Sequence, residues 1–452
     1  MDGTNLRTAS GDIIVLQGVG LGGSLNMENF ITGYPGAEFQ MRKALLKVLG
    51  KEGYARFFDR FLDVFYTEED ARYLASLGLN SVRLPFNYHH FEDDARPFVI
   101  KEEGFRRLDQ VIEASSRHGI YTILDLHAVP GYQNQGWHSD NPTHWAHFWT
   151  HPHFQDRVVH LWEAIADRYK ENPWVAGYNP VNEPADVSGE VIGPFYRRLE
   201  AAIRAVDATH VLFLDGNRYS TDFDQLGDPL ANTVYAAHDY ALPGFVDGGP
   251  YPGVSRGQYV DRSVVEKTFL TRTGYMRRTG TPIWVGEFGP VYTGDPERDD
   301  QRYRLLEDQL AIYRQYGASW ALWTYKDIGL QGLVHTSQDS AYIQRIAPVL
   351  EKKARLGVDA WGSVDTGVRQ VLGPLEQLFA EDFPDFDPYP WGRQRWVHGI
   401  VRHVLLAEAL VGDYARCFEG LNAGEAEKLA DAFQLKHCVR RERLADLLRA
   451  GS

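Results

Sequence analysis

The chain has 452 residues and a formal net charge of −14 at pH 7, with 44% hydrophobic and 24% charged residues. Such a composition is typical of a globular protein with a large core, and the negative charge repels phosphate backbones and anionic membranes. Since no run of about 18 apolar residues occurs either, we expect neither a nucleic acid nor a membrane as a partner.

The ends and the cysteines indicate the compartment. The first residues lack the basic segment and the apolar segment of a secretory signal peptide, so we expect a cytoplasmic protein. Cys417 and Cys438 are too few for a disulfide framework or a zinc quartet. Oligomeric state stays open at this point.

Short apolar runs alternate with amphipathic segments along the chain. The runs predict strands at residues 13–18, 79–84, 120–126, 175–181, 211–214, 233–237, 283–285 and 320–323. Between them, helical patterns lie at residues 67–77, 108–118, 154–169, 194–206, 262–279 and 300–316. Thr67 and Asp70 form a capping-box pattern that begins the first of these helices, and Gly119 closes the second.

Eight strands separated by helices predict parallel βα units, which most simply close into a (β/α)8 TIM barrel. A doubly wound open sheet is the alternative. Gly18, Gly20, Gly22 and Gly23 follow the first strand, but no acidic residue stands at the spacing that a ribose-binding site needs, so a dinucleotide site is disfavoured.

Two segments depart from a minimal barrel. The first βα connection, residues 21–66, is long and has a helical segment of its own. We expect the barrel to occupy residues 1–345, and residues 346–452 to form a helical C-terminal extension that packs on it as part of the same unit.

Polar and titratable residues gather at the predicted strand ends, where TIM barrels carry their active sites. They are Arg83, His127, Asn182, Glu183, His238, Tyr240, Glu287 and Trp323. Each alone has an ordinary structural interpretation: a lone histidine, for example, is more often a hydrogen-bonded core residue. Their coincidence at successive strand ends favours a site instead.

Two carboxylates across a barrel mouth suit glycoside hydrolysis, in which one protonates the leaving oxygen and the other attacks the anomeric carbon. Arg83 would keep Glu287 ionised, while Glu183, in a more apolar setting, would hold its proton. Retention would require a spacing of about 5–5.5 Å between the carboxyl groups. A carbohydrate-binding protein without catalysis is an alternative. A metal hydrolase is another, but it would need a His-x-His pair where the first strand ends in Gly18-Val19-Gly20.

The same eight residues carry a resemblance: in order and strand placement the sequence is similar to glycoside hydrolase family 5, the cellulase-like retaining glycosidases. The resemblance implies that Glu183 is the acid/base and Glu287 the nucleophile. It implies that Asn182 contacts the sugar 2-hydroxyl, and that Arg83 and Tyr240 contact the nucleophile. No metal or organic cofactor is implied, and the partner is an oligosaccharide substrate.

Further resemblances concern the substrate. Residues 22–28 are similar to the Gly-Gly-Trp segment of exo-acting family members, with Ser24 in place of Trp, which implies that Glu28 grips the terminal sugar. Residues 26–36 and the loop with Trp137 and His138 resemble the bacterial β-mannosidase-like branch, which acts on Manβ1,4GlcNAc of the N-glycan core. We therefore expect a β-mannosidase. An exo-β-glucanase or β-glucosidase, or an endo-acting glucanase or mannanase, is the alternative.

Overall fold

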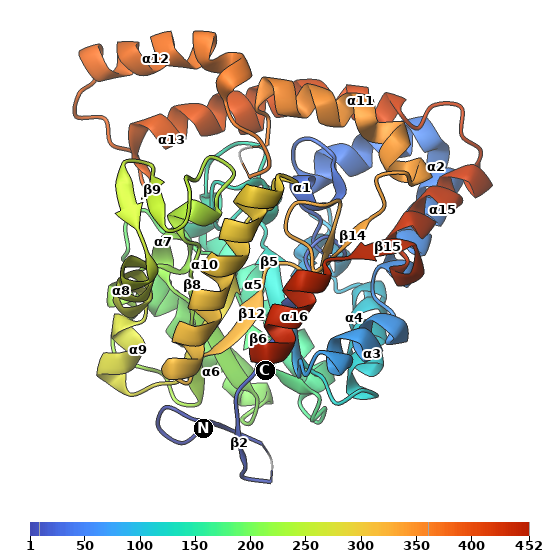
Figure 1. The fold of residues 1–452 in the computed structure, drawn as a ribbon. Helices are drawn as coiled ribbons and strands as arrows, with labels where there is room; N and C mark the ends of the chain where they lie inside the picture. Colours follow the sequence, from blue (N-terminus) through green and yellow to red (C-terminus); the bar gives the residue numbers. More distant parts are fainter. Residues whose placement is uncertain (9, 360, 452) are drawn as a thin grey trace.

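A computed structural model describes residues 1–8, 10–359 and 361–451, and its centre is a closed barrel of eight parallel strands (Figure 1). In barrel order these are β3 (Gln17–Gly20), β4 (Ser81–Asn87), β5 (Tyr121–Ala128), β6 (Val175–Asn179), β7 (Val211–Asp215), β8 (Thr233–His238), β11 (Ile283–Phe288) and β12 (Ser319–Leu322). Closure occurs where Trp320 of β12 pairs with Gln17 of β3. The predicted (β/α)8 fold is confirmed.

Helices cover the outside of the barrel. They are α3 (Glu68–Ser76), α4 (Glu102–Ser116), α5 (Pro152–Tyr169), α6 (Ile192–Val206), α8 (Arg262–Arg272), α9 (Gly274–Thr279) and α10 (Pro296–Gln315), while the single turn α7 (Asn217–Ser220) follows β7 and α11 (Ala341–Leu356) lies at the mouth. The capping box of α3 is present, since Asp70 Oδ2 accepts the backbone N–H of Thr67 at 2.9 Å. Two short antiparallel strands, β9 (Gly253–Ser255) and β10 (Gln258–Val260), stand at the mouth before α8.

The first predicted strand is displaced. The prediction placed it at residues 13–18, but Ile13–Ile14 form β2, which pairs with β1 (Leu6–Arg7) outside the barrel. Ile13 is 57% exposed, whereas Val19 in β3 is fully buried. The hairpin of β1 and β2 lies at the amino-terminal end of the barrel, far from the mouth (Figure 1).

The long first connection contains α1 (Asn29–Thr32) and α2 (Glu38–Phe65), a helix interrupted at Gly50, whose φ of 67° is left-handed. One face of α2 is rich in phenylalanine. Phe57 meets Phe418 edge to face at 5.7 Å, and Phe61 meets Phe433 at 4.9 Å, both partners coming from the C-terminal extension. The first connection and the extension therefore share one apolar cluster.

The C-terminal extension packs on the barrel, as predicted. It contains α12 (Arg369–Asp382), α13 (Gly392–His398), the π-helical turn Gly399–Leu405, α14 (Leu406–Arg416), α15 (Ala423–Ala430), β15 (Cys438–Arg440) and α16 (Glu442–Gly451). β15 pairs with β14 (Val334–Thr336), which also pairs with β13 (Lys326–Asp327) just after the last barrel strand. Figure 1 shows α11, α12 and α13 lying across the mouth. None of the described helices is long and apolar enough to cross a membrane.

Candidate active site

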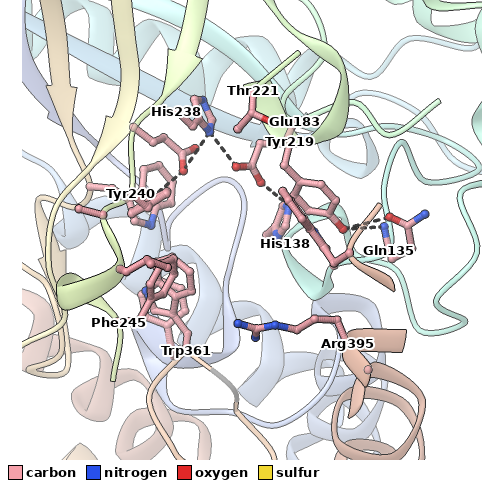
Figure 2. A pocket seen from close by; sticks show the side chains of 18 of the residues that line it. Gln135, His138, Glu183, Tyr219, Thr221, His238, Tyr240, Phe245, Trp361 and Arg395 are labelled. Atoms are coloured by element: carbon pink, nitrogen blue, oxygen red, sulfur yellow. Dashed lines mark hydrogen bonds and ion pairs between the residues drawn. The ribbon is translucent and has the colours of Figure 1, made fainter. Parts of the chain in front are cut away.

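A cavity of about 550 Å³ opens at the carboxyl ends of the barrel strands. Its inner part is lined by strand-end residues, and its outer part by the β8–α8 region and the C-terminal extension (Figure 2). Of the ten predicted site residues, eight line this cavity: Glu28, His127, Trp137, Glu183, His238, Tyr240, Glu287 and Trp323. Arg83 and Asn182 lie behind the carboxylates, buried and in contact with Glu287 or with each other.

Glu183 and Glu287 face each other across His238. The Nδ1 atom of His238 lies 2.8 Å from Oε1 of Glu183 and 3.5 Å from Oε2 of Glu287. One carboxylate oxygen of each glutamate and the imidazole nitrogen all lie within 4.8 Å of one another. Oxygens this close are consistent with the carboxyl spacing of about 5–5.5 Å in retaining glycosidases, and they favour it over the about 6.5–9.5 Å of inverting ones.

Glu287 is held on both oxygens. Nη1 of Arg83 donates to Oε1 at 2.5 Å, and the Tyr240 hydroxyl donates to Oε2 at 2.9 Å. Nη2 of Arg83 also donates to Asn182 Oδ1 at 2.6 Å and lies 3.1 Å from Asp125 Oδ2, so its side chain is fixed in one orientation. A buried, hydrogen-bonded guanidinium stabilises negative charge on Glu287 through space.

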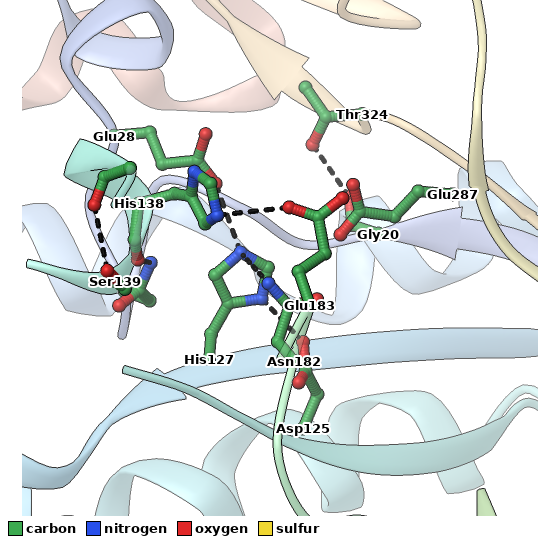
Figure 3. Close-up of polar contacts among 12 residues, drawn as sticks. Gly20, Glu28, Asp125, His127, His138, Ser139, Asn182, Glu183, Glu287 and Thr324 are labelled. Atoms are coloured by element: carbon green, nitrogen blue, oxygen red, sulfur yellow. Dashed lines mark hydrogen bonds and ion pairs between the residues drawn. The ribbon is translucent and has the colours of Figure 1, made fainter. Parts of the chain in front are cut away.

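Glu183 does not have the apolar setting that the sequence suggested. Its two oxygens lie 3.0 Å from His138 Nε2 and 2.8 Å from His238 Nδ1 (Figures 2 and 3). Burial raises the pKa of Glu183, but the hydrogen bonds to both imidazoles and their positive charge outweigh it, so that the pKa is lowered. The expectation of apolar surroundings for Glu183 is therefore wrong, while its role as the acid stays a prediction.

The backbone of Glu183 is in an unusual conformation. Its φ is 45°, a left-handed value for a non-glycine residue. The Glu183 N–H donates to Asp215 Oδ2 at 2.9 Å, and Asn134 Nδ2 donates to the Glu183 carbonyl at 2.9 Å. These bonds hold the strained peptide, which places the carboxylate in the cavity.

A second group of polar contacts is centred on His127, beside Glu183 (Figure 3). Nδ1 of His127 is 2.7 Å from Asp125 Oδ2, its Nε2 is 3.2 Å from Asn182 Nδ2, and Glu28 Oε1 lies 3.4 Å from the same Nε2. Burial lowers the pKa of His127, but Asp125 and Glu28 raise it to about 10. Burial also raises the pKa of the Glu28 carboxyl.

Among the described residues, buried polar atoms of this cavity that make no hydrogen bond include Glu28 Oε1 and Trp137 Nε1. Glu28 Oε1 has a close contact with His127 Nε2, at 3.4 Å. Glu28 and Trp137 both line the cavity, and Trp137 is fixed edge to face on His403 at 4.3 Å. An acceptor and a donor left unpaired in a cavity are groups that a polyhydroxylated ligand satisfies.

The glycines after the first barrel strand make room for Trp323. A Cβ atom on Gly20 would lie 2.5 Å from Trp323 Cε3, and one on Gly22 would lie 2.5 Å from Cζ2. The indole also stacks on His127, with centroids 5.4 Å apart and planes 5° from parallel. The glycine run therefore allows the close approach of an indole platform, which explains it without a phosphate site.

Sequence reasoning missed several cavity residues. His138 was noted only as part of a loop, and Tyr219, Phe245, Trp361, Trp391 and Arg395 were not singled out. Only the high tryptophan content, eleven in the chain, hinted at additional aromatic walls. Glu183, His238 and Glu287 are close enough to share a metal ion, but Arg83 already occupies Glu287 Oε1. The expected independence from metals and cofactors stays a prediction.

Comparison with known proteins agrees with this geometry. The family description "Cellulase (glycosyl hydrolase family 5)" matches residues 52–329. A "Beta-xylosidase" of Phanerodontia chrysosporium is 46% identical over 463 residues, covering 99% of this chain and 97% of the relative. "Endoglucanase C" of Acetivibrio thermocellus is 23% identical over 341 residues, covering 66% and 95%.

Solved structures agree in fold. The crystal structure of a glycoside hydrolase matches with a TM-score of 0.53 at 20% identity, covering 70% of this chain and 90% of the other. That of an endogalactoceramidase matches with a TM-score of 0.51 at 17% identity, covering 72% and 74%. At these identities the likeness establishes the barrel architecture alone.

Proposed function

Because the chain belongs to glycosyl hydrolase family 5, we propose that it is a retaining glycosidase that releases one terminal β-xylosyl residue, with Glu183 as acid/base and Glu287 as nucleophile. The observation that carries the mechanism is the short spacing of these carboxylates across His238. What supports the sugar is the full-length similarity to a protein named β-xylosidase.

The reaction proceeds in two displacements. Glu287 attacks the anomeric carbon and forms an ester with the sugar, while Glu183 gives a proton to the departing oxygen. Water then attacks the same carbon, Glu183 takes its proton, and Glu287 leaves as a carboxylate. The Arg83 and Tyr240 bonds to Glu287 hold it in place for attack and stabilise it when it is released.

The proton for the first step has a short path. Hydrogen bonds to His138 and His238 lower the pKa of Glu183, and His238 Nδ1 lies 2.8 Å from its Oε1, close enough to exchange a proton. A substrate that fills the cavity removes water from this cluster, and the loss of solvation disfavours the separated charges. The proton then moves to Glu183, where the leaving oxygen can accept it.

Exo action is favoured by the residues that line the inner part of the cavity. Glu28, in the long first connection, and Trp137, from the β5–α5 loop, present polar atoms there that make no hydrogen bond with the described residues. Hydrogen bonds from sugar hydroxyls to a charged acceptor contribute about 1.5–3 kcal/mol each. A longer chain of sugars would have no room beyond this wall and would lose those bonds.

The β-mannoside predicted from the sequence is the alternative sugar. Its motif resemblance covers two loops, whereas the similarity to the β-xylosidase extends over the whole chain, so we place β-xylose first. The relatives compared above do not include a β-mannosidase by name.

The test is a panel of 4-nitrophenyl β-glycosides of xylose, mannose, glucose and cellobiose. We expect the highest kcat/KM with the β-xyloside, and NMR should show β-xylose as the first product anomer. Highest kcat/KM with the mannoside would restore the sequence-based substrate, and α-xylose as first product would refute retention. In separate assays, the protein should cleave xylobiose and should not cause a rapid fall in the viscosity of soluble xylan. A rapid fall in viscosity would mean endo action.

A further inference from the structure

The outer half of the cavity differs from the sugar-binding inner half. Its walls are mostly apolar: Leu242, Phe245, Val260, Val264, Trp361 and Trp391. Phe245 and Trp361 meet edge to face at 5.4 Å, and Trp361 also packs on Tyr240 at 4.9 Å, so this aromatic wall begins beside the nucleophile's hydrogen-bond donor. Such a wall offers few hydrogen bonds to a second sugar and suits a flat apolar group.

One cation in this region has no partner. Among the arginines lining the cavity, Arg256 pairs with Asp247, Arg272 pairs with Asp239 at 2.8 Å, and Arg402 donates to the Ser363 carbonyl at 2.9 Å. The side chain of Arg395, in α13, makes no hydrogen bond or ion pair with any described residue. Figure 2 shows its side chain reaching into the cavity opposite Phe245 and Trp361.

The surroundings of Arg395 favour an anion. The Arg395 side chain is exposed at the mouth of the cavity. Partial desolvation and the positive charge of Arg256 still lower its pKa, and Asp247 offsets them only in part. The chain as a whole is strongly negative, yet four arginines line this mouth. A ligand carboxylate would supply the missing counter-ion in a site where water is partly excluded.

We propose that the outer cavity binds the leaving group of the substrate as an aromatic aglycone that bears a carboxylate, with Arg395 as its counter-ion and Trp361, Phe245 and Trp391 as its walls. This rests on the proposed function for the position of the scissile bond. The substrate class is then a β-glycoside of a hydroxylated aromatic acid. Arg395 acts on selectivity, and takes no part in proton transfer.

The first experiment compares two substrates that differ only in charge: the β-xylosides of 6-hydroxy-2-naphthoic acid and of its carboxamide. Taking the ratio of their kcat/KM values in each variant cancels the intrinsic difference in leaving-group reactivity. In Arg395→Gln we expect the carboxylate-to-amide ratio to fall about 10-fold to 100-fold, as for the loss of a charge-assisted hydrogen bond. Arg395→Lys should restore most of it. An unchanged ratio in Arg395→Gln would overturn the proposal.

The control is Arg304→Gln, which removes the same charge from an exposed ion pair on α10, outside the cavity lining. It should leave the ratio within about twofold of the original, because surface pairs contribute little. A fall as large as that in Arg395→Gln would show a general effect of net charge and would also overturn the proposal.

The second experiment needs no sugar. Calorimetry would measure binding of free 6-hydroxy-2-naphthoate and of 2-naphthol to the full chain. We expect Arg395→Gln to weaken naphthoate at least tenfold and leave naphthol unchanged, while Trp391→Ala weakens both. Naphthoate that binds the Arg395→Gln variant as tightly as the original chain would refute the anion site. If naphthoate binding depends on Arg395 but no β-xyloside is cleaved, the proposed β-xylosidase activity is wrong, while the proposed binding site for an aromatic carboxylate is supported.

Discussion

Glu183 and Glu287 have different neighbours, and their substitutions should have different effects. Glu287→Ala removes the group that forms the ester, so kcat/KM should collapse for every substrate. Glu183→Ala should lower kcat/KM about 10²–10⁴-fold for xylobiose, whose leaving oxygen needs a proton, and far less for a dinitrophenyl xyloside. Equal losses of Glu183→Ala on both substrates would contradict the assignment.

The contact of His138 with Glu183 predicts that His138→Asn changes the pH dependence of kcat/KM, which a purely structural role of His138 would not do. It is one of two imidazoles that lower the pKa of Glu183, so His138→Asn should raise that pKa. Because the acid must be protonated, the alkaline limb of kcat/KM for xylobiose should move to higher pH. The limb for an activated aryl xyloside should stay in place.

The matched control for His138 is His160→Asn, which replaces a half-buried histidine that contacts the Phe98 carbonyl outside the cavity lining. It should leave both profiles unchanged. If the alkaline limb of kcat/KM for xylobiose moved to lower pH in His138→Asn, the imidazoles and not Glu183 would determine that limb.

At the scale of single residues, the sequence alone predicted the site residues that lie at the carboxyl ends of the barrel strands. Residues such as Arg83 and Glu287 follow directly from barrel geometry, because parallel strands bring their carboxyl ends to one rim. His138 does not, because it lies in a long loop whose path depends on contacts such as Asn134 Nδ2 to His138 Nε2 at 2.9 Å. The surroundings of Glu183 were misjudged in part for the same reason, because His138, one of the two imidazoles that lower its pKa, comes from that loop.

Among the elements, β13 and α3 are joined by a fully buried charge pair. Lys326 Nζ lies 2.8 Å from Asp70 Oδ1, and it also donates to the carbonyls of Phe65 and Phe433. Lys326→Met would leave a buried carboxylate without its cation, so the free energy of unfolding should fall by about 3–5 kcal/mol, measured by urea denaturation.

The comparison for Lys326 is Lys352→Met, which breaks a partly exposed pair with Asp413. That change should lower the free energy of unfolding by no more than about 1 kcal/mol. Similar losses in the two variants would show that the buried pair has no special weight.

The positions of barrel strands were predictable from the sequence where consecutive residues of the strand are all buried. Apolar runs such as residues 120–126 become strands buried on both faces, a pattern that local sequence carries. The first strand was set too early because Ile13 and Ile14 are also apolar, and only pairing of Gly18 with Ala321 and Ser81 fixes the register. That pairing joins residues about 60 and 300 positions away, beyond any local pattern.

At the scale of the whole molecule, barrel and extension should fold together. Phe57 and Phe61 of α2 pack on Phe418 and Phe433, and β15 completes a sheet begun after β12. A chain ending at Leu356 should therefore expose this cluster and be insoluble or lose cooperative unfolding, as followed by calorimetry and near-UV circular dichroism. A soluble, cooperatively folded fragment would make residues after the barrel a separate module.

The position of α13 across the mouth has a consequence for biosynthesis. A ribosome adds residues from the amino-terminal end, so both reacting glutamates emerge more than a hundred positions before Arg395. Until translation passes α13, the nascent chain has its carboxylates but lacks the outer wall of the cavity. Selectivity for the leaving group is therefore among the last properties that this polypeptide acquires as it is made.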